Sequence, residues 1–164
     1  MEPTRDGGSR ALVPRAPERP ATIGIFAPSG RVEADRLAEG IARLEAAGHR
    51  VVMAEEAGRE WRYFAGSDGD RLAGLSRLLA DPAIDVMLAA RGGYGLSRLL
   101  PHIDWTLVRA SGKAMVGFSD FTVLQLGLLA RTPGAVTWAG PALCEGFGAA
   151  DAADASEGHG GATT

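Results

Sequence analysis

The feature that most constrains the fold of this chain is a regular alternation of short apolar runs with stretches of helical periodicity. Leu37, Ile41 and Leu44, for example, are spaced by four and three residues, as on one face of an amphipathic helix. The predicted strands are residues 21–27, 50–54, 84–90, 113–118 and 135–139. This order predicts an α/β domain built on a doubly wound parallel sheet of about five strands, with helices on both faces.

The ends of the predicted helices carry recognisable signals. Gly48 follows the first helix, where a glycine commonly terminates helices, and Ser67 is suited to cap the second, which stops at Asp81 and Pro82. Shorter helical segments are predicted at 96–100 and 104–110, and a further helix at 119–131. The run 84–90 is almost entirely apolar, as expected of a strand covered on both faces. Together these signals predict a flavodoxin-like arrangement.

Both ends of the chain differ in composition from its middle. Residues 1–21 contain four prolines and show no periodicity, which predicts a disordered leader. Residues 145–164 carry four acidic residues, no lysine or arginine, and a glycine-rich end, which predicts a disordered tail. The predicted folded domain is therefore residues 22–144.

Charge and cysteine content exclude several classes of protein. The formal net charge of −3 argues against a general nucleic-acid binder. Cys144 is the single cysteine, so neither an internal disulfide framework nor a cysteine-rich zinc site is expected, and no His/Cys/Asp cluster suggests another metal site. No apolar run approaches the roughly 20 residues that span a bilayer, and the N-terminus lacks the apolar run of a secretory signal. We therefore expect a cytoplasmic protein without a membrane partner.

Three unusual loops are predicted to share one edge of the sheet. They follow the first, third and fourth predicted strands and comprise residues 27–30, 91–95 and 117–120. In an open parallel sheet, ligands bind beyond the carboxyl ends of the strands. This edge, which we call the rim, is therefore the predicted functional site.

Ser119 is the candidate nucleophile of the rim. It follows Gly117 and Phe118 at a sharp strand-to-helix turn, where the free N–H groups and dipole of a helix favour developing negative charge. The sequence departs from the second half of the usual G-x-S-x-G elbow, because Asp120 and Phe121 follow the serine. On the tetrapeptide alone, helix capping by Ser119 and Asp120 is the competing interpretation.

The loop Arg91-Gly92-Gly93-Tyr94-Gly95 exposes backbone N–H groups that are suited to hold an oxyanion or a phosphate. It does not have the spacing of a nucleotide-binding glycine loop, and a simple packing turn is the alternative. Arg91 offers a fixed positive charge for a substrate carboxylate or for a surface ion pair. In the first loop, Ser29 is interpreted as a second exposed serine or as part of a turn.

The histidines do not stand out as general bases. His49 and His102 are predicted at surface turns, and His159 lies in the predicted tail. The three tryptophans are interpreted as packing residues rather than as a ligand platform.

These motifs together resemble the N-terminal part of the LD-carboxypeptidase family of serine peptidases, which includes muramoyl-tetrapeptide carboxypeptidases and microcin C resistance proteins. The resemblance covers about residues 22–148. Its matching segments, in chain order, are 25–30, 64–68 with Arg71, 90–95, 117–120 and 140–141.

The resemblance implies an activity and a role for each residue of the rim. Such enzymes remove the terminal D-alanine from peptidoglycan stem tetrapeptides during murein recycling, and relatives hydrolyse a peptide-nucleotide antibiotic. Ser119 is then the nucleophile, while the backbone N–H of Asp120 and that of Gly92 or Gly93 form the oxyanion hole. Arg91 or Tyr94 is expected to orient the muropeptide, and no cofactor is implied.

The resemblance also identifies what the sequence lacks. In the family, the glutamate and histidine that activate the serine come from a C-terminal domain, and full chains are roughly twice this length. We therefore expect this chain to be an N-terminal half that is inactive alone, whether as a fragment, a frameshifted product or a truncation. The resemblance further implies a homodimer for full-length members of the family.

Two alternatives remain open at the level of sequence. One is a non-catalytic domain that binds a muropeptide or a nucleotide-like ligand along the rim. The other is a flavodoxin-like or Rossmann nucleotide-binding domain, which is disfavoured because the first strand leads into Pro28-Ser29-Gly30 without a phosphate loop.

Overall fold

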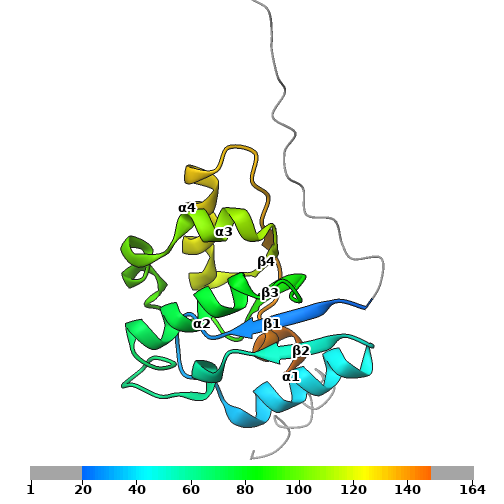
Figure 1. Ribbon diagram of the computed structural model, residues 1–164. Coiled ribbons are helices and arrows are strands. Elements are labelled where there is room, and N and C mark those ends of the chain that lie inside the picture. Colours follow the sequence, from blue (N-terminus) through cyan, green and yellow to red (C-terminus); the bar gives the residue numbers. More distant parts are fainter. Residues whose placement is uncertain (1–19, 149–164) are drawn as a thin grey trace, which may run out of the picture.

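A five-stranded parallel sheet forms the centre of the computed structural model, which describes residues 20–148. The strand order is β2-β1-β3-β4-β5, the flavodoxin-like order, so the predicted fold class is confirmed (Figure 1). The strands are β1 (Thr22–Phe26), β2 (Arg50–Met53), β3 (Val86–Ala89), β4 (Ala114–Gly117) and β5 (Trp138–Ala139).

The sheet is best paired and most deeply buried at β1 and β3. All five residues of β1 are buried, and β1 pairs in parallel with β2 on one side and β3 on the other. Ile25, for example, lies opposite Met53 and Leu88. The edge strands β2 and β5 are more exposed, as expected of strands with one free side.

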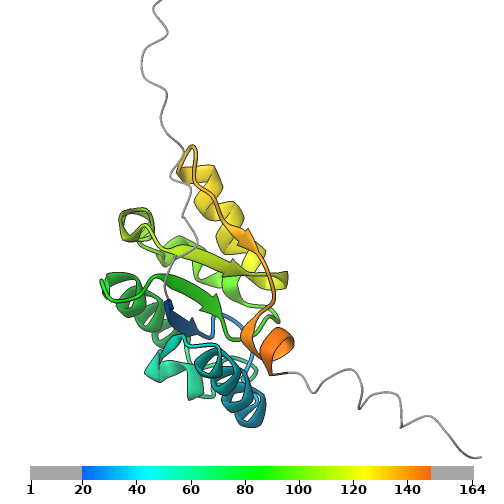
Figure 2. The same cartoon turned by 90° about the vertical axis from the view of Figure 1, so that its right-hand side faces the viewer.

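Helices cover the two faces of the sheet unequally. The α-helices are α1 (Ala34–Ala46), α2 (Asp68–Ala80), α3 (Trp105–Ser111) and α4 (Thr122–Arg131). Helix α1 packs with a π-helical turn, η5 (Leu143–Phe147), whereas α2, α3 and α4 pack in sequence beside one another on the other face (Figures 1 and 2). The 3₁₀ turns are η1 (Glu55–Gly58), η2 (Leu96–Arg98), η3 (Leu100–His102) and η4 (Ser119–Phe121).

Local signals fix the helix ends as predicted. The Ser67 hydroxyl accepts the N–H of Asp70 while the Asp70 carboxylate accepts that of Ser67, a complete capping box at the start of α2. Asp104 caps α3 through the N–H groups of Thr106 and Leu107. After α1, Gly48 adopts the left-handed backbone conformation, with φ of 89°.

The structure differs from the sequence prediction at three places. The last strand is only two residues long, and the predicted helix at 119–131 begins with the 3₁₀ turn η4 before α4. Helical order also continues through Phe147 because η5 packs on α1, so the first residues of the tail predicted at 145–164 belong to this turn. The leader predicted at 1–21 and the tail predicted to end at 164 lie largely outside the described residues.

The core ties the rim to the sheet. Phe121 is fully buried directly after the candidate serine loop, and its ring meets that of Phe26 edge to face with centroids 5.9 Å apart. Met87 and Met115 complete the buried layer beneath them. The buried Phe121 side chain therefore anchors the loop segment 118–120 to the core of the sheet.

Within residues 20–148, no helix is both long and apolar enough to cross a membrane.

Candidate active site

The three predicted loops meet at the carboxyl ends of β1, β3 and β4. The Gly30 N–H donates to the Gly92 carbonyl oxygen over 3.4 Å, which joins the first loop to the second. A Cβ atom placed on Gly92 would lie 3.2 Å from both Cβ and Oγ of Ser119, so the second loop also lies directly against the third. The structure thus brings together the loops that the sequence predicts to share the rim.

Ser119 occupies a strained backbone conformation. Its φ of 58° lies in the left-handed region, which a residue with a Cβ adopts at a cost of about 1–3 kcal/mol. The preceding Phe118 is extended, so the chain reverses sharply at the serine. Among residues 20–148, no hydrogen bond engages the Ser119 hydroxyl. This combination of a strained turn and an available hydroxyl is typical of a nucleophile elbow.

Asp120 contributes two separate groups. Within the described residues its backbone N–H has no hydrogen-bond partner, as an oxyanion-hole donor requires. Its carboxylate is engaged: one oxygen, Oδ2, accepts the Ser29 hydroxyl at 2.7 Å and the Leu96 N–H at 2.9 Å. The sequence indicates only a backbone donor or a helix-capping role for Asp120, because nothing local predicts hydrogen-bond partners in distant parts of the chain.

The glycines of the second loop are required by space and by backbone conformation. Gly93 has a φ of 123°, and a Cβ there would lie 2.9 Å from the Tyr63 hydroxyl and 3.2 Å from the Gly30 nitrogen. In the described part of the chain, the N–H groups of Gly92 and Gly93 carry no hydrogen bond. Both therefore stay available as donors beside Ser119.

Arg71 is a buried cation that the sequence indicates only as part of a motif. It is 2% exposed, and its Nη1 donates to the carbonyl oxygens of Pro28, at 2.6 Å, and Gly95, at 3.3 Å. Nη2 pairs with Asp68, and the guanidinium lies 4.7 Å from the centroid of the Phe64 ring. The signal for Arg71 in the sequence is its place on the predicted helix shortly after the capping residue Ser67.

The two candidate substrate-orienting residues occupy different settings. Arg91 donates to the Arg31 carbonyl oxygen at 2.7 Å and lies 3.9 Å from the Glu145 carboxylate, so part of its charge already serves the protein. Tyr94 is 56% exposed, and its ring stacks on that of Tyr63 with centroids 4.2 Å apart. Tyr94 is therefore presented to solvent at the rim on a fixed support.

Ser29 and the histidines are placed differently from one another. Ser29 is fully buried, which corrects its interpretation as an exposed serine: its hydroxyl serves Asp120. His49 is half-buried and accepts the Ala21 N–H through Nδ1 at 3.1 Å, at the opposite end of β1 from the rim. His102 is exposed in η3, and His159 lies outside the described residues.

Charge around the rim is supplied by paired groups. Hydrogen bonds from Arg98, and then from Arg71, hold the pKa of Asp68 below its ordinary value against the opposing effect of burial. Behind the second loop, where the Cys144 N–H donates to the Ala90 carbonyl oxygen, burial raises the pKa of the Cys144 thiol to about 11. Across residues 20–148, no group of three or more His, Cys, Asp or Glu side chains is placed to hold a metal ion.

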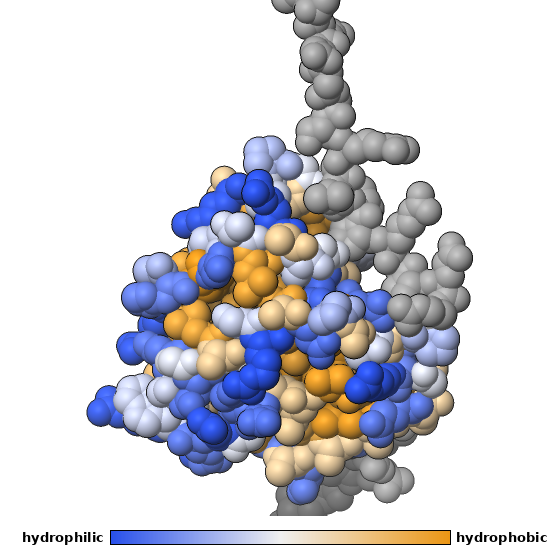
Figure 3. Space-filling model, in the orientation of Figure 1, coloured by the Kyte–Doolittle hydropathy of each residue, from blue (hydrophilic) through white to orange (hydrophobic). Residues whose placement is uncertain are grey.

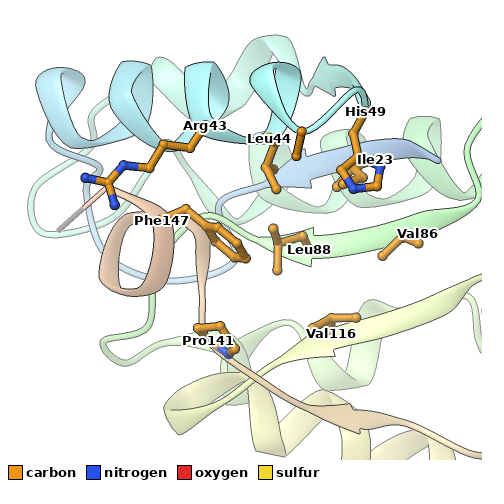
Figure 4. Close-up of a pocket in the computed structure, with 10 residues that line it drawn as sticks. Ile23, Arg43, Leu44, His49, Val86, Leu88, Val116, Pro141 and Phe147 are labelled. Atoms are coloured by element: carbon orange, nitrogen blue, oxygen red, sulfur yellow. The ribbon is translucent and has the colours of Figure 1, made fainter. Parts of the chain in front are cut away.

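An apolar groove of about 300 Å³ lies on the α1 face of the sheet, away from the loops of the rim. Figure 4 shows side chains from β1, β3 and β4 beneath α1, with Phe147 of η5 and Pro141 beside them. Its apolar lining includes Ile23, Leu44, Val86, Leu88 and Val116. None of the candidate catalytic residues lines the groove.

A strained serine at the carboxyl edge of a doubly wound sheet, facing a glycine turn with available N–H groups, is typical of serine hydrolases. The sequence comparison defines the group more closely. Residues 23–140 match the LD-carboxypeptidase N-terminal domain, and the chain therefore belongs to this carboxypeptidase family.

Curated relatives carry the same family assignment. A putative carboxypeptidase of Streptomyces coelicolor is 41% identical over 125 residues, which are 74% of this chain and 40% of that protein. A probable murein peptide carboxypeptidase of Bacillus subtilis is 33% identical over 138 residues, covering 84% of this chain and 43% of its own length. The chain thus spans about two fifths of the length of the curated relatives it matches.

Solved structures share the fold. The microcin C7 self-immunity protein MccF in complex with aspartyl sulfamoyl adenosine superposes with a TM-score of 0.78 at 30% identity, over 84% of this chain and 41% of that one. The muramoyltetrapeptide carboxypeptidase of Oxalobacter formigenes gives a TM-score of 0.73 at 34% identity, over 79% of this chain and 43% of that one. A further MccF structure is described as an active-site mutant in which a serine is among the residues replaced by alanine.

Proposed function

We propose that this chain supplies the nucleophile-bearing half of a serine LD-carboxypeptidase that removes the terminal D-alanine from peptidoglycan stem tetrapeptides in cytoplasmic murein recycling. The observation that carries the proposal is the left-handed backbone of Ser119 directly against Gly92, at the edge of the sheet where such folds bind ligands. The murein peptide and murein tetrapeptide carboxypeptidases among its relatives support the substrate class.

The geometry supports acyl transfer in two steps. The Ser119 oxygen attacks the carbonyl carbon of the scissile amide, and its proton passes to a general base. The negative oxygen that results accepts hydrogen bonds from the N–H groups of Asp120 and of Gly92 or Gly93. Collapse breaks the C–N bond, and the protonated amine leaves as D-alanine. Water then attacks the acyl ester and returns the free serine.

The general base is proposed to come from outside the described residues. Within residues 20–148, His49 is engaged at the far end of β1, His102 is exposed in η3, and no hydrogen bond joins either of them to the Ser119 hydroxyl. A serine with an oxyanion hole but without a positioned base loses most of its nucleophilic power. We therefore propose that the 164-residue chain is inactive alone.

The test compares this chain with a fused protein that adds, after residue 148, the C-terminal portion of the Streptomyces coelicolor relative. D-alanine release from a stem tetrapeptide is expected from the fused protein and not from the 164-residue chain. In the fused protein, Ser119→Ala is expected to abolish release. Persistent activity in that variant rules out Ser119 as the nucleophile, and release by the unfused chain rules out an external base.

A non-catalytic binding function is the second candidate. It is favoured by the MccF structures, whose ligands are aspartyl sulfamoyl adenosine and glutamyl sulfamoyl guanosine. For this alternative we expect the fused protein to bind such a ligand without hydrolysing either a stem tetrapeptide or an aminoacyl nucleotide. Binding is then measured by calorimetry, and turnover by D-alanine or amino-acid release.

A further inference from the structure

Two loops of the rim are held together by a buried cation. The Arg71 guanidinium projects from α2 between them, and its Nη1 donates to Pro28 of the first loop and to Gly95 of the second. The side chain itself is fixed, since Asp68 binds Nη2 and the Phe64 ring lies against the guanidinium. A single planar cation thus binds one carbonyl oxygen of each loop.

The same two loops are held together a second time by an anion. Oδ2 of Asp120 accepts the Ser29 hydroxyl and the Leu96 N–H, the residues that immediately follow the two carbonyls bound by Arg71. Each loop is therefore held at two consecutive residues, once through a carbonyl oxygen and once through a donor. Two attachments at neighbouring residues prevent the loops from hinging about either one.

We propose that Arg71 and Asp120 are positioning residues that together preorganise the oxyanion-binding turn before any partner or substrate arrives. Gly92 and Gly93 lie in the same loop, shortly before the attached residues Gly95 and Leu96, and the N–H group of one of them must face Ser119 within a few tenths of an ångström to act. We call the contacts that Arg71 and Asp120 make with the two loops the clamp. The role of the clamp in catalysis rests on the proposed function, whereas its contacts are formed within this chain.

The placement of the anion explains why Asp120 is suited to this role. Asp120 follows Ser119 directly, so fixing its carboxylate also fixes the peptide unit that carries its free N–H. The left-handed conformation of Ser119 persists only if the surrounding structure over-determines it. Asp120 on one side and buried Phe121 beyond it supply that constraint.

The decisive variants are Asp120→Ala and Asp120→Asn in the 164-residue chain. Because both hydrogen bonds of the carboxylate fall on one oxygen, the amide oxygen of asparagine is able to accept both. Asp120→Ala is therefore expected to release the clamp, and Asp120→Asn to retain it. The matched control is Glu56→Ala, which removes a buried carboxylate bonded to Arg77 and away from the rim.

The first readout is amide hydrogen exchange, followed residue by residue by NMR. Gly30 and Arg31 are informative because their N–H groups bond to Gly92 and Tyr63, not to Asp120. Loss of hydrogen bonds to a charged group is expected to accelerate their exchange about tenfold or more in Asp120→Ala. In Asp120→Asn the exchange rates of Gly30 and Arg31 are expected to stay near those of the wild type. In Glu56→Ala the ratio between the exchange rates of rim amides and core amides is expected to stay unchanged.

A substitution of the cation tests the other half of the clamp. Arg71→Lys keeps the charge but replaces the planar fork by a single ammonium group, which is unable to reproduce the fixed set of contacts. The amides of Gly30 and Arg31 are expected to exchange faster in this variant as well. If Arg71→Lys does not fold, the three variants at Asp120 and Glu56 still decide the proposal.

The second readout is covalent labelling of Ser119 by a fluorophosphonate in the fused protein, followed by intact mass. Labelling is expected to slow about tenfold or more in Asp120→Ala, corrected for the folded fraction, and to recover in Asp120→Asn. If Ser119 of the wild-type fused protein is not labelled, the proposed function is overturned. Amide hydrogen exchange in the 164-residue chain then still tests the clamp. The proposed clamp is overturned if the exchange rates of Gly30 and Arg31 are unchanged in Asp120→Ala. It is also overturned if Asp120→Ala and Asp120→Asn lose protection at these amides to the same extent.

Discussion

Gly92 marks the closest approach of two loops at the scale of single residues. A methyl group there would meet Ser119 at 3.2 Å, tighter than ordinary contact, so the serine must move to admit it. In the fused protein we expect Gly92→Ala to slow D-alanine release by roughly tenfold, because the serine must shift by a few tenths of an ångström and a full displacement of about 1 Å at a reacting centre costs about 100-fold. The measurement is the initial rate at saturating tetrapeptide.

Gly58 provides the matched control for this substitution. A Cβ at Gly58 meets no atom within 4 Å, and the residue lies in η1, outside the three loops. Gly58→Ala is expected to release D-alanine at the wild-type rate. Equal rates for Gly92→Ala and the wild type would show that the loop tolerates a side chain beside the serine.

The buried thiol of Cys144 predicts a dependence of stability on pH. Burial raises its pKa from the ordinary 9.0 to about 11, so the folded chain holds the proton that the unfolded chain releases first. The stabilising contribution is complete below pH 9 and is lost as the pH rises toward 11. Urea unfolding between these pH values is expected to show a loss of stability in the wild type that Cys144→Ala lacks.

The reactivity of the same thiol checks this expectation independently. At pH 8 the native thiol is almost fully protonated and 3% exposed, so a disulfide reagent is expected to modify it slowly. Modification is expected to become fast in urea. Rapid labelling of the native chain would contradict both the burial and the raised pKa.

The residues of the rim differ in how far the sequence predicts them. Ser119, Gly92 and Gly93 belong to short local motifs, so the sequence marks them as candidates, and the resemblance to the family assigns them the roles of nucleophile and donors. The carboxylate of Asp120 and the guanidinium of Arg71 act across 91 and 43 positions of the chain, respectively. Such contacts depend on the packing of the whole sheet and leave no periodic signal in the sequence.

Among the elements, η5 has the largest effect on the boundary of the domain. Leu143 is fully buried, and a Cβ on Gly40 of α1 would lie 2.8 Å from its Cγ, so the turn and the helix interlock. Leu143→Ala is expected to lower the free energy of unfolding by about 2–5 kcal/mol. Urea denaturation followed by far-ultraviolet circular dichroism measures the change.

Leu126 on α4 is the corresponding control. It is 60% exposed, so truncating it removes few buried contacts. We expect Leu126→Ala to change the free energy of unfolding by no more than about 0.5 kcal/mol. If Leu143→Ala unfolds at the same urea concentration as Leu126→Ala, η5 does not stabilise the domain.

The order of strands and helices was predictable because each element carries its own period and its own end signals. Ser67 and Gly48 mark helix ends by mechanisms that operate within a few residues. The element η5 was missed because Glu145 and Gly146 are poor apolar markers, and its stability comes from contact with α1. The short length of β5 likewise reflects its place at the edge of the sheet, which the apolar run 135–139 does not reveal.

At the scale of the whole molecule, apolar surface is distributed in separate areas. On the face shown in Figure 3, hydrophobic residues gather in patches that hydrophilic residues separate. The groove of Figure 4 adds an apolar hollow beside α1, because the described helices on that face do not cover β3 and β4 completely. A face of this kind is accessible to small apolar molecules.

The groove is expected to bind the dye 8-anilinonaphthalene-1-sulfonate with a rise in its fluorescence. Val116→Lys places a charge on the groove floor and is expected to reduce this fluorescence while leaving circular dichroism unchanged. Leu129→Lys, on the exposed surface of α4, is the control and is expected to retain it. Equal fluorescence in all three proteins would show that the dye binds elsewhere.

The clamp at the rim also has a consequence for the order of folding. Asp120 reaches back 91 positions to Ser29, so this bond closes only when β1 and β4 lie in the same sheet, whereas Arg71 reaches back 43 positions to Pro28 and requires only β1 and α2. Contacts between distant parts of a chain form only after the intervening loop entropy has been overcome. The strained turn at Ser119 is therefore completed at the end of folding. Partly folded chains contain every residue of the nucleophile loop but lack its native geometry. A reagent that reacts only with the native conformation of the Ser119 turn therefore measures the fraction of molecules that have reached the native state.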